Sequence, residues 1–305
     1  MKLFSSIFVL SMTTTAAFAA EIQFTQGPAK AVNEGLFDCG DKSRISAVGE
    51  IVSEDGTVWT VPAATNFEAA PKAADLYNEC DGNKLGSIAD LNDETVPLLD
   101  AGGSEEFTMY IFADNYFELN VNGKLLAVDP VPFTQFNSNV VRFKANRPLN
   151  LAIMAVDWEE NLGLGSEDNR GVAYHAGDGG FVAVLKDADG NIIDVTDDTW
   201  KAQTFYTAPL DTKECIVDRD SSACSTEGVD DGTKFFAAHW PVPSDWTSAE
   251  FDDSAWPNAT TYTNKTIGVD NKKAYTNFTS VFDNPTNDAE FVWSSNVVLL
   301  RKTIE

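Results

Sequence analysis

The chain has 305 residues, and its 43% of hydrophobic and 11% of aromatic residues are enough to bury a large core. A formal net charge of −26 at pH 7 repels phosphate backbones and anionic lipid surfaces, so nucleic acid is excluded as an expected partner. The acidic residues are spread along the chain, which is typical of a folded acidic protein and not of a disordered tail.

The first twenty residues have the pattern of an export signal. Lys2 precedes an apolar stretch from Leu3 to Met12, and Ala17-Phe18-Ala19 matches the A-x-A cleavage pattern. An apolar stretch of about ten residues is too short to cross a hydrocarbon layer of ~30 Å, so residues 1–20 are predicted to be a signal peptide. We therefore expect a secreted or extracellular protein without membrane insertion, with a periplasmic or cell-surface location as the alternative.

The cysteines at positions 39, 80, 215 and 224 are even in number, which favours disulfides in an exported protein. Their spacings fit no zinc-binding pattern. The pairing Cys39–Cys80 and Cys215–Cys224 is favoured among the three connectivities, because each pair lies within one polar segment. Residues 21–100 are predicted to be an N-terminal β extension that contains the first disulfide and packs on the main body, residues 101–305.

Short apolar or alternating runs separated by turn signals predict β-hairpins along the chain. Asn-Gly and Asp-Gly favour the positive φ angles of tight hairpin turns. Helical periodicity is nearly absent, and the best helix candidate is 69–80. The expected hairpins join Ile45–Val52 to Thr57–Val61, Phe117–Val121 to Lys124–Val128, and Gly180–Leu185 to Asn191–Val195.

Two later stretches are polar. Residues 207–234 are predicted to be a surface insertion closed by the Cys215–Cys224 disulfide, since a loop of this length needs a constraint. Residues 257–290 form the second stretch, and an exposed loop is expected at 257–280. It holds three N-glycosylation sequons, which begin at Asn258, Asn264 and Asn277.

Five segments after residue 106 carry a family resemblance. They are Tyr110–Lys124, Asn150–Asp157, Thr196–Lys201, Phe251–Trp256 and Val298–Lys302. Together, over about residues 107–305, they resemble the galactose-binding-like domain of rhamnosidase-type glycoside hydrolases and their accessory modules. The resemblance implies an all-β fold, an antiparallel jelly-roll β-sandwich, and carbohydrate binding. It does not extend to glycosidase activity, because it includes no catalytic barrel, and residues 21–100 match no part of it.

The segment 157–180 between two predicted strands is the candidate binding loop. Glycine lets a backbone approach a ligand, carboxylates and amides bind sugar hydroxyls, and aromatic faces stack on pyranose rings. The alternative is an ordered loop in which Arg170 pairs with a carboxylate and Trp158 fills the end of the sandwich. The predicted ligand-binding residues are Asp157, Trp158, Glu159, Asn161, Arg170, Tyr174, His175 and Asp178.

Three functions remain open from the sequence. The first is a non-catalytic glycan-binding protein, which requires no cofactor; the resemblance implies a structural calcium ion, with Asp157, Glu160 and Asp168 as its candidate ligands. The second is a carbohydrate-active hydrolase centred on His175 and neighbouring carboxylates, although no nucleophile motif accompanies them and no catalytic residue is assigned. The third is a structural cell-surface or matrix protein without a small ligand.

Overall fold

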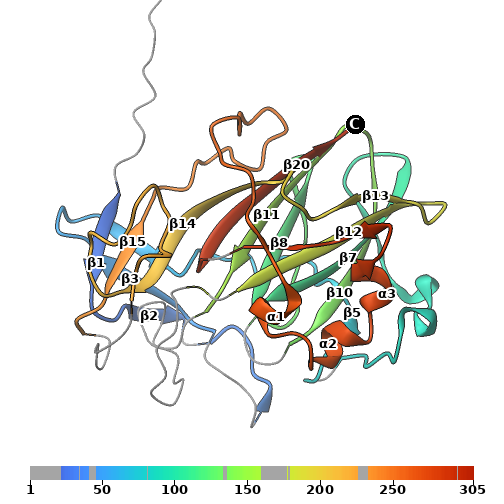
Figure 1. The fold of residues 1–305 in the computed structure, drawn as a ribbon. Helices are drawn as coiled ribbons and strands as arrows, with labels where there is room; N and C mark the ends of the chain where they lie inside the picture. The colour runs from blue at the N-terminus through green and yellow to red at the C-terminus, as the bar shows by residue number, and fades with distance from the viewer. Residues whose placement is uncertain are drawn as a thin grey trace, which may run out of the picture.

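Two mainly antiparallel β-sheets packed face to face form the body of the protein (Figure 1). The structure is a computed structural model that describes residues 22–33, 35–40, 46–80, 82–132, 136–158, 177, 179–225, 233–293 and 295–305. No helix in these ranges is long and apolar enough to cross a membrane.

The strands of the two sheets come from the whole chain, including the N-terminal extension. The first sheet has the order β1 (Gln23–Gln26), β15 (Phe236–His239), β14 (Lys201–Leu210), β20 (Val297–Ile304), β11 (Leu149–Val156), β8 (Tyr116–Val121) and β9 (Lys124–Val128). The second has the order β13 (Ile192–Val195), β12 (Gly180–Asp187), β7 (Glu105–Asp114), β10 (Ser138–Ala145) and β5 (Ala74–Tyr77), and β6 (Leu98–Asp100) pairs with β10 in parallel.

The core between the sheets follows from the alternation of side chains along each strand. Phe107, Met109 and Ile111 of β7 face Leu151 and Ile153 of β11 across the interior, and all are at most 2% exposed. The prediction of an all-β sandwich is therefore confirmed.

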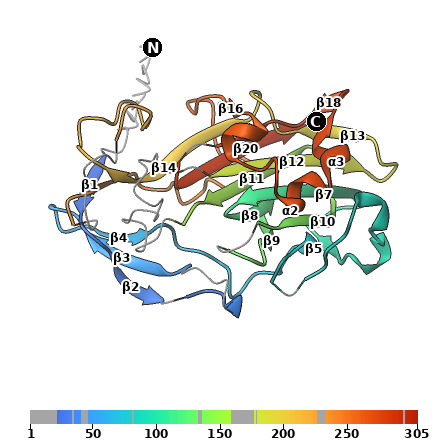
Figure 2. The same ribbon diagram turned by 60° about the horizontal axis from the view of Figure 1, so that its bottom comes forward.

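The outer face of the first sheet is covered by the N-terminal extension. A small sheet of β2 (Lys30–Asn33), β3 (Val48–Val52) and β4 (Val58–Val61) lies at the end of the molecule that carries β1 (Figure 2). Val61 and the following Phe67 join Tyr116 and Val156 in one apolar cluster on this face. The extension thus shares its core with the sandwich.

The outer face of the second sheet is covered by residues 264–282, so the expected exposed loop at 257–280 is wrong. Three short helices, α1 (Asn264–Ile267), α2 (Lys273–Thr276) and α3 (Thr279–Phe282), lie against this face (Figure 1). Tyr275 and Phe282 are buried there beside Phe112 of β7. The apolar residues of this stretch are widely spaced among polar ones, so its overall composition is polar and predicted an exposed loop.

Other short elements complete the cover. The single-turn 3-10 helices η2 (Ile88–Asp90) and η3 (Asp93–Thr95) precede β6. The two-residue strands are β16 (Thr261–Tyr262), which pairs with β19 (Phe291–Val292), and β17 (Asp283–Asn284), which pairs with β18 (Asn287–Asp288).

The predicted hairpins and disulfides are confirmed. The pairs β3–β4, β8–β9 and β12–β13 are antiparallel, and Asn122 and Gly123 take φ angles of 50° and 80° in the second turn. The disulfides join Cys39 to Cys80 and Cys215 to Cys224. The helix expected at 69–80 is wrong, because Ala74–Tyr77 forms β5 and pairs with β10.

Two of the five resemblance segments meet at one buried arginine. Arg301 of β20 donates from Nε to Asp253 Oδ2 at 2.8 Å, from Nη2 to Ser248 O at 3.1 Å, and from Nη1 to Trp246 O. The arginine thereby fixes the turn 251–256 to the sheet.

Candidate functional site

Only part of the predicted binding loop lies in the described residues. Asp157, Trp158 and the glycines at 177 and 179 are described. The other predicted ligand-binding and metal-binding residues lie outside the described ranges: Glu159, Glu160, Asn161, Asp168, Arg170, Tyr174, His175 and Asp178.

Trp158 is a core residue, which corrects its predicted role as a stacking platform for a sugar. It is 1% exposed, and its indole N–H donates to Ala47 O at 2.8 Å. Its ring meets Tyr116 edge-on at a centroid distance of 5.4 Å. Large aromatic side chains usually contribute buried area, and this one packs in the apolar cluster on the outer face of the first sheet, together with Tyr116 and Val156.

Asp157 is also buried, at 4% exposure, and its backbone N–H donates to Asn296 O at 2.7 Å. Among the described residues no group of three His, Cys, Asp or Glu side chains is placed to hold a metal ion. Because the other two candidate calcium ligands lie outside the described ranges, the calcium site stays a prediction.

A pocket of about 650 Å³ lies beside the end of the predicted loop, since both Gly177 and Gly179 line it. Its floor includes Gln203 and Thr204 of β14, and Trp293 lines it as well. Strand β15 pairs with β14 only from Tyr206 onward, and this leaves the edge of β14 open at residues 203–204. The pocket occupies this opening.

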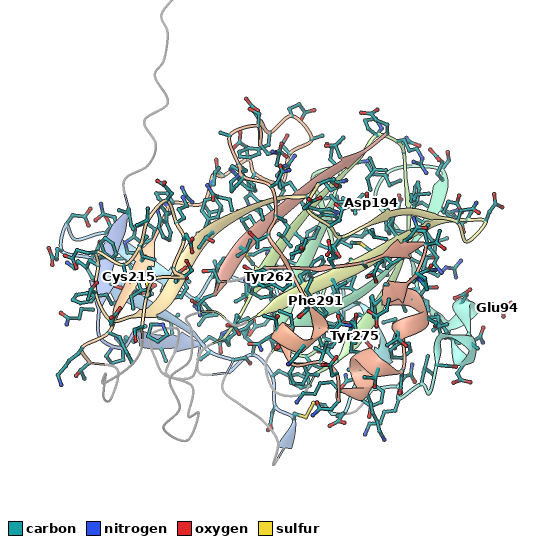
Figure 3. The ribbon with its side chains drawn as sticks, in the orientation of Figure 1. Glu94, Asp194, Cys215, Tyr262, Tyr275 and Phe291 are labelled. Carbon is teal, nitrogen blue, oxygen red and sulfur yellow. A yellow bond between two sulfur atoms is a disulfide. The ribbon has the colours of Figure 1, made fainter. Side chains whose placement is uncertain are left out.

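One wall of the pocket is the segment that follows residue 256. Ala202 N donates to Pro257 O at 3.1 Å, and Lys201 Nζ donates to Asn258 Oδ1 at 2.8 Å, so the segment is fixed to β14. Tyr262, labelled in Figure 3, follows on this wall and is held through the β16–β19 pair.

Another part of the lining is the loop closed by the Cys215–Cys224 disulfide. Within it, Val217 and Asp220 exchange backbone hydrogen bonds of 3.2 and 2.9 Å around Asp218 and Arg219. These two central residues have φ angles of 50° and 69°, as in a type I′ turn, where Asn-Gly is preferred. A left-handed conformation costs a residue with a side chain roughly 1 kcal/mol or more, so Arg219 holds a position that favours glycine.

The Arg219 side chain lies across the open edge of β14. Its Nη1 donates to Thr204 O at 2.6 Å, and the centre of its guanidinium lies 4.8 Å from the Phe205 ring and 5.1 Å from the Trp240 ring. Partial burial lowers the pKa of Arg219 to about 10, so the group stays charged at pH 7. No ion pair joins it to a carboxylate of any described residue.

The described lining of the pocket offers many short polar groups. Asp218, Asp220 and Ser221 supply oxygens from one wall, and Gln203 supplies an amide from the floor. The Gln203 side chain makes no hydrogen bond to another described residue, so its amide is available to a ligand. Such a set can bind hydroxyl groups, while no histidine or cysteine lines the described part of the pocket.

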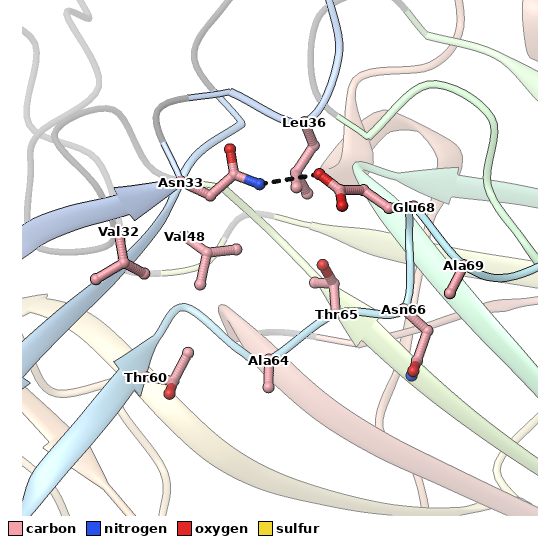
Figure 4. A pocket seen from close by; sticks show the side chains of 10 residues that line it. All are labelled: Val32, Asn33, Leu36, Val48, Thr60, Ala64, Thr65, Asn66, Glu68 and Ala69. Carbon is pink, nitrogen blue, oxygen red and sulfur yellow. Dashed lines mark hydrogen bonds between the residues drawn. The ribbon is translucent and has the colours of Figure 1, made fainter.

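A second, smaller pocket of about 360 Å³ lies between the small sheet and residues 64–69 (Figure 4). Its side chains are mostly small or apolar. Asn33 Nδ2 donates to Glu68 Oε1 at 3.3 Å, so these polar groups already satisfy each other. This pocket is a weaker candidate for a polar ligand.

His239 has a structural role. It is 2% exposed, its Nε2 lies 2.7 Å from Thr25 Oγ1, and its ring stacks on Trp59 at 5.0 Å. Burial lowers the pKa of His239 to about 3, so it is neutral and cannot serve as a base that titrates near pH 7.

Comparison of the chain with protein-family models, with curated proteins and with solved structures gives no match. The resemblance of residues 107–305 to galactose-binding-like domains therefore stays a prediction, while the all-β sandwich stands on the structure itself.

The pocket residues were missed by the sequence analysis. Gln203, Arg219 and Tyr262 belong to segments far apart in the chain, and only strand pairing brings them together. One signal was available. Loops on a rigid scaffold often carry function, and the insertion closed by Cys215–Cys224 is such a loop.

Proposed function

We propose that this is a secreted, non-catalytic carbohydrate-binding protein whose glycan site is the pocket beside β14, which is lined in part by Gly177 and Gly179 from the end of the predicted binding loop. The observation that carries the proposal is the lining of the pocket: hydroxyl, amide, carboxylate and guanidinium groups converge on it from separate segments. Sugars present many hydroxyl groups that both donate and accept hydrogen bonds, and a mixed polar lining satisfies them.

The size and the aromatic content of the pocket support the same function. Small-molecule sites commonly enclose about 300–1,000 Å³, and this one has about 650 Å³. Tyr262, which is half-buried, contributes aromatic surface of the kind that packs against the C–H face of a pyranose ring. Secretion is supported by the signal pattern of residues 1–20 and by the two disulfides.

The test is direct binding of glycans to the chain from residue 21 onward, by array and then by calorimetry, with calcium and with a chelator. Gln203→Leu keeps the side-chain size and removes the amide. The loss of one neutral hydrogen-bonding group is expected to weaken binding about 5- to 15-fold.

A matched control is Gln26→Leu. Gln26 lies on β1, outside the pocket, and its amide donates only a long 3.4 Å bond to Lys234 O. Glycan affinity should be unchanged in this variant. Absence of binding to every glycan at millimolar concentration, with and without calcium, would refute the proposal. Release of new reducing ends during incubation would instead indicate a hydrolase.

A further inference from the structure

Arg219 is a cation placed in a pocket of a strongly acidic protein, and it makes little use of its own hydrogen-bonding capacity. A guanidinium has five N–H donors. Among the described residues only Thr204 O accepts a hydrogen bond from it, and the rings of Phe205 and Trp240 lie against the group. These contacts fix the position of the side chain and leave other N–H groups of the guanidinium unused by the described residues.

The carboxylates that flank Arg219 do not neutralise it. Asp218 and Asp220 are its neighbours in the chain, yet the described residues form no ion pair with it. Both carboxylates are exposed to solvent, and Asp220 Oδ1 accepts from Ser222 N at 2.8 Å. The turn thus keeps the guanidinium of Arg219 apart from the carboxylates of Asp218 and Asp220, although these residues are adjacent in the chain.

The backbone gives an independent reason to assign a role to this side chain. Position 219 has a φ of 69°, a conformation that glycine adopts without cost, and a flexible arginine occupies it. The Cys215–Cys224 disulfide closes the loop around it, with a sequence separation of 9. The fold therefore presents the guanidinium at the tip of a constrained turn.

We infer that Arg219 binds an anionic substituent of the sugar, a carboxylate or a sulfate ester, so that the pocket selects acidic glycans. The inference rests on the proposed function. Guanidinium forms charge-assisted, often bidentate hydrogen bonds with planar anions, and partial burial of the group strengthens them relative to water. The carboxylates of Asp218 and Asp220 accept hydrogen bonds from hydroxyl groups of the same sugar. The turn therefore suits a ligand that carries both an anionic group and hydroxyl groups.

The experiment compares ligands that differ only in charge. One pair is a galacturonic acid oligosaccharide and its methyl ester, and the other is a sulfated galactan oligosaccharide and its desulfated form. Wild-type protein is expected to bind one of the two anionic ligands at least tenfold more tightly than its neutral counterpart. The pair that shows the difference identifies the anionic group.

The key variant is Arg219→Gly, because glycine fits the φ of 69° and keeps the loop folded while the guanidinium is removed. Affinity for the anionic ligand should fall about 10- to 150-fold, and affinity for the neutral ligand should stay within twofold. Arg219→Lys keeps the charge and loses the planar fork, so it should recover only part of the affinity.

Lys213→Gln is the matched control for charge. Lys213 lies in the same connection between β14 and β15, pairs with Glu54 at 3.2 Å, and does not line the pocket. The Lys213→Gln variant should leave the affinities for the anionic and for the neutral ligand unchanged. If neutral glycans bind and Arg219→Gly does not alter the preference between the paired ligands, the inference is wrong and the proposed function stands. If neither neutral nor anionic glycans bind, both are wrong.

Discussion

Replacing Arg301 by methionine tests whether one buried arginine holds the turn 251–256 against the sandwich. The side chain is 2% exposed and donates to Asp253, Trp246 and Ser248. Methionine has a similar length and keeps the contact with the core, so the change removes mainly the charge and its hydrogen bonds.

The expected cost follows from these contacts. Each hydrogen bond to a charged donor contributes about 1.5–3 kcal/mol, but the guanidinium also pays for its loss of hydration, and the terms do not add. Breaking a buried ion pair by removing one partner typically costs about 3–5 kcal/mol, and we expect Arg301→Met to lie in that range. Asp253→Asn should cost less, about 1 kcal/mol, because that side chain is 27% exposed.

The assay is equilibrium unfolding in urea. The free energies of unfolding are compared with the same dependence on urea concentration (m-value) for wild type and variants. Arg142→Met is the control. Arg142 pairs with Glu106 at 3.7 Å on the surface, and its loss should cost less than about 1 kcal/mol. A cost below about 1 kcal/mol for Arg301→Met, or equal costs for the two arginines, would refute the reasoning.

Three further predictions concern stability. His239 has a pKa of about 3 in the folded state against 6.5 in the unfolded chain, so its contribution to stability is complete above pH 6.5 and is lost as the pH falls. In the wild type the free energy of unfolding should therefore fall by about 1.4 kcal/mol per pH unit below 6.5 because of this group, and His239→Gln should remove that dependence. The measurement is the free energy of unfolding of both proteins as a function of pH. Replacing Cys39–Cys80 by serines should cost about 3.9 kcal/mol and Cys215–Cys224 about 2.6 kcal/mol, from sequence separations of 41 and 9, and equal midpoints in urea would contradict this order. Trp158→Ala should lower the free energy of unfolding by about 3–5 kcal/mol and leave glycan affinity of the folded protein unchanged; weaker binding would restore its predicted role as a ligand platform.

The features predicted correctly from sequence are those set by local chemistry. A tight hairpin turn of this type requires two residues with positive φ, and few dipeptides other than Asn-Gly meet that requirement, so the turn between β8 and β9 could be placed at Asn122-Gly123. The Cys215–Cys224 pair is also local, with a sequence separation of 9, whereas Cys39 and Cys80 are 41 residues apart and were paired because both lie in the N-terminal extension. The fold class and most strand positions could therefore be predicted from patterns within short stretches of the sequence.

The features that were missed depend on contacts between distant segments. Residues 264–282 looked polar, yet Tyr275 and Phe282 pack against the second sheet, and no periodic pattern marks helices of one turn. The pocket is a stronger case. Its floor on β14 is open only because β15 starts to pair at Tyr206, a register that no local signal encodes.

Two arginines in the same protein show how structural and ligand-binding cations can be told apart. Arg301 donates from all three of its nitrogens to described protein oxygens, has a carboxylate partner at 2.8 Å, and sits on a regular strand. Arg219 donates one hydrogen bond, has no carboxylate partner in the described chain, and occupies a strained turn at a pocket. Of the four arginines in the described residues, Arg142, Arg147 and Arg301 each pair with a carboxylate and Arg219 does not, so its placement requires a reason. A negatively charged ligand supplies that reason, because its arrival completes at Arg219 the hydrogen bonding that the protein itself completes at Arg301.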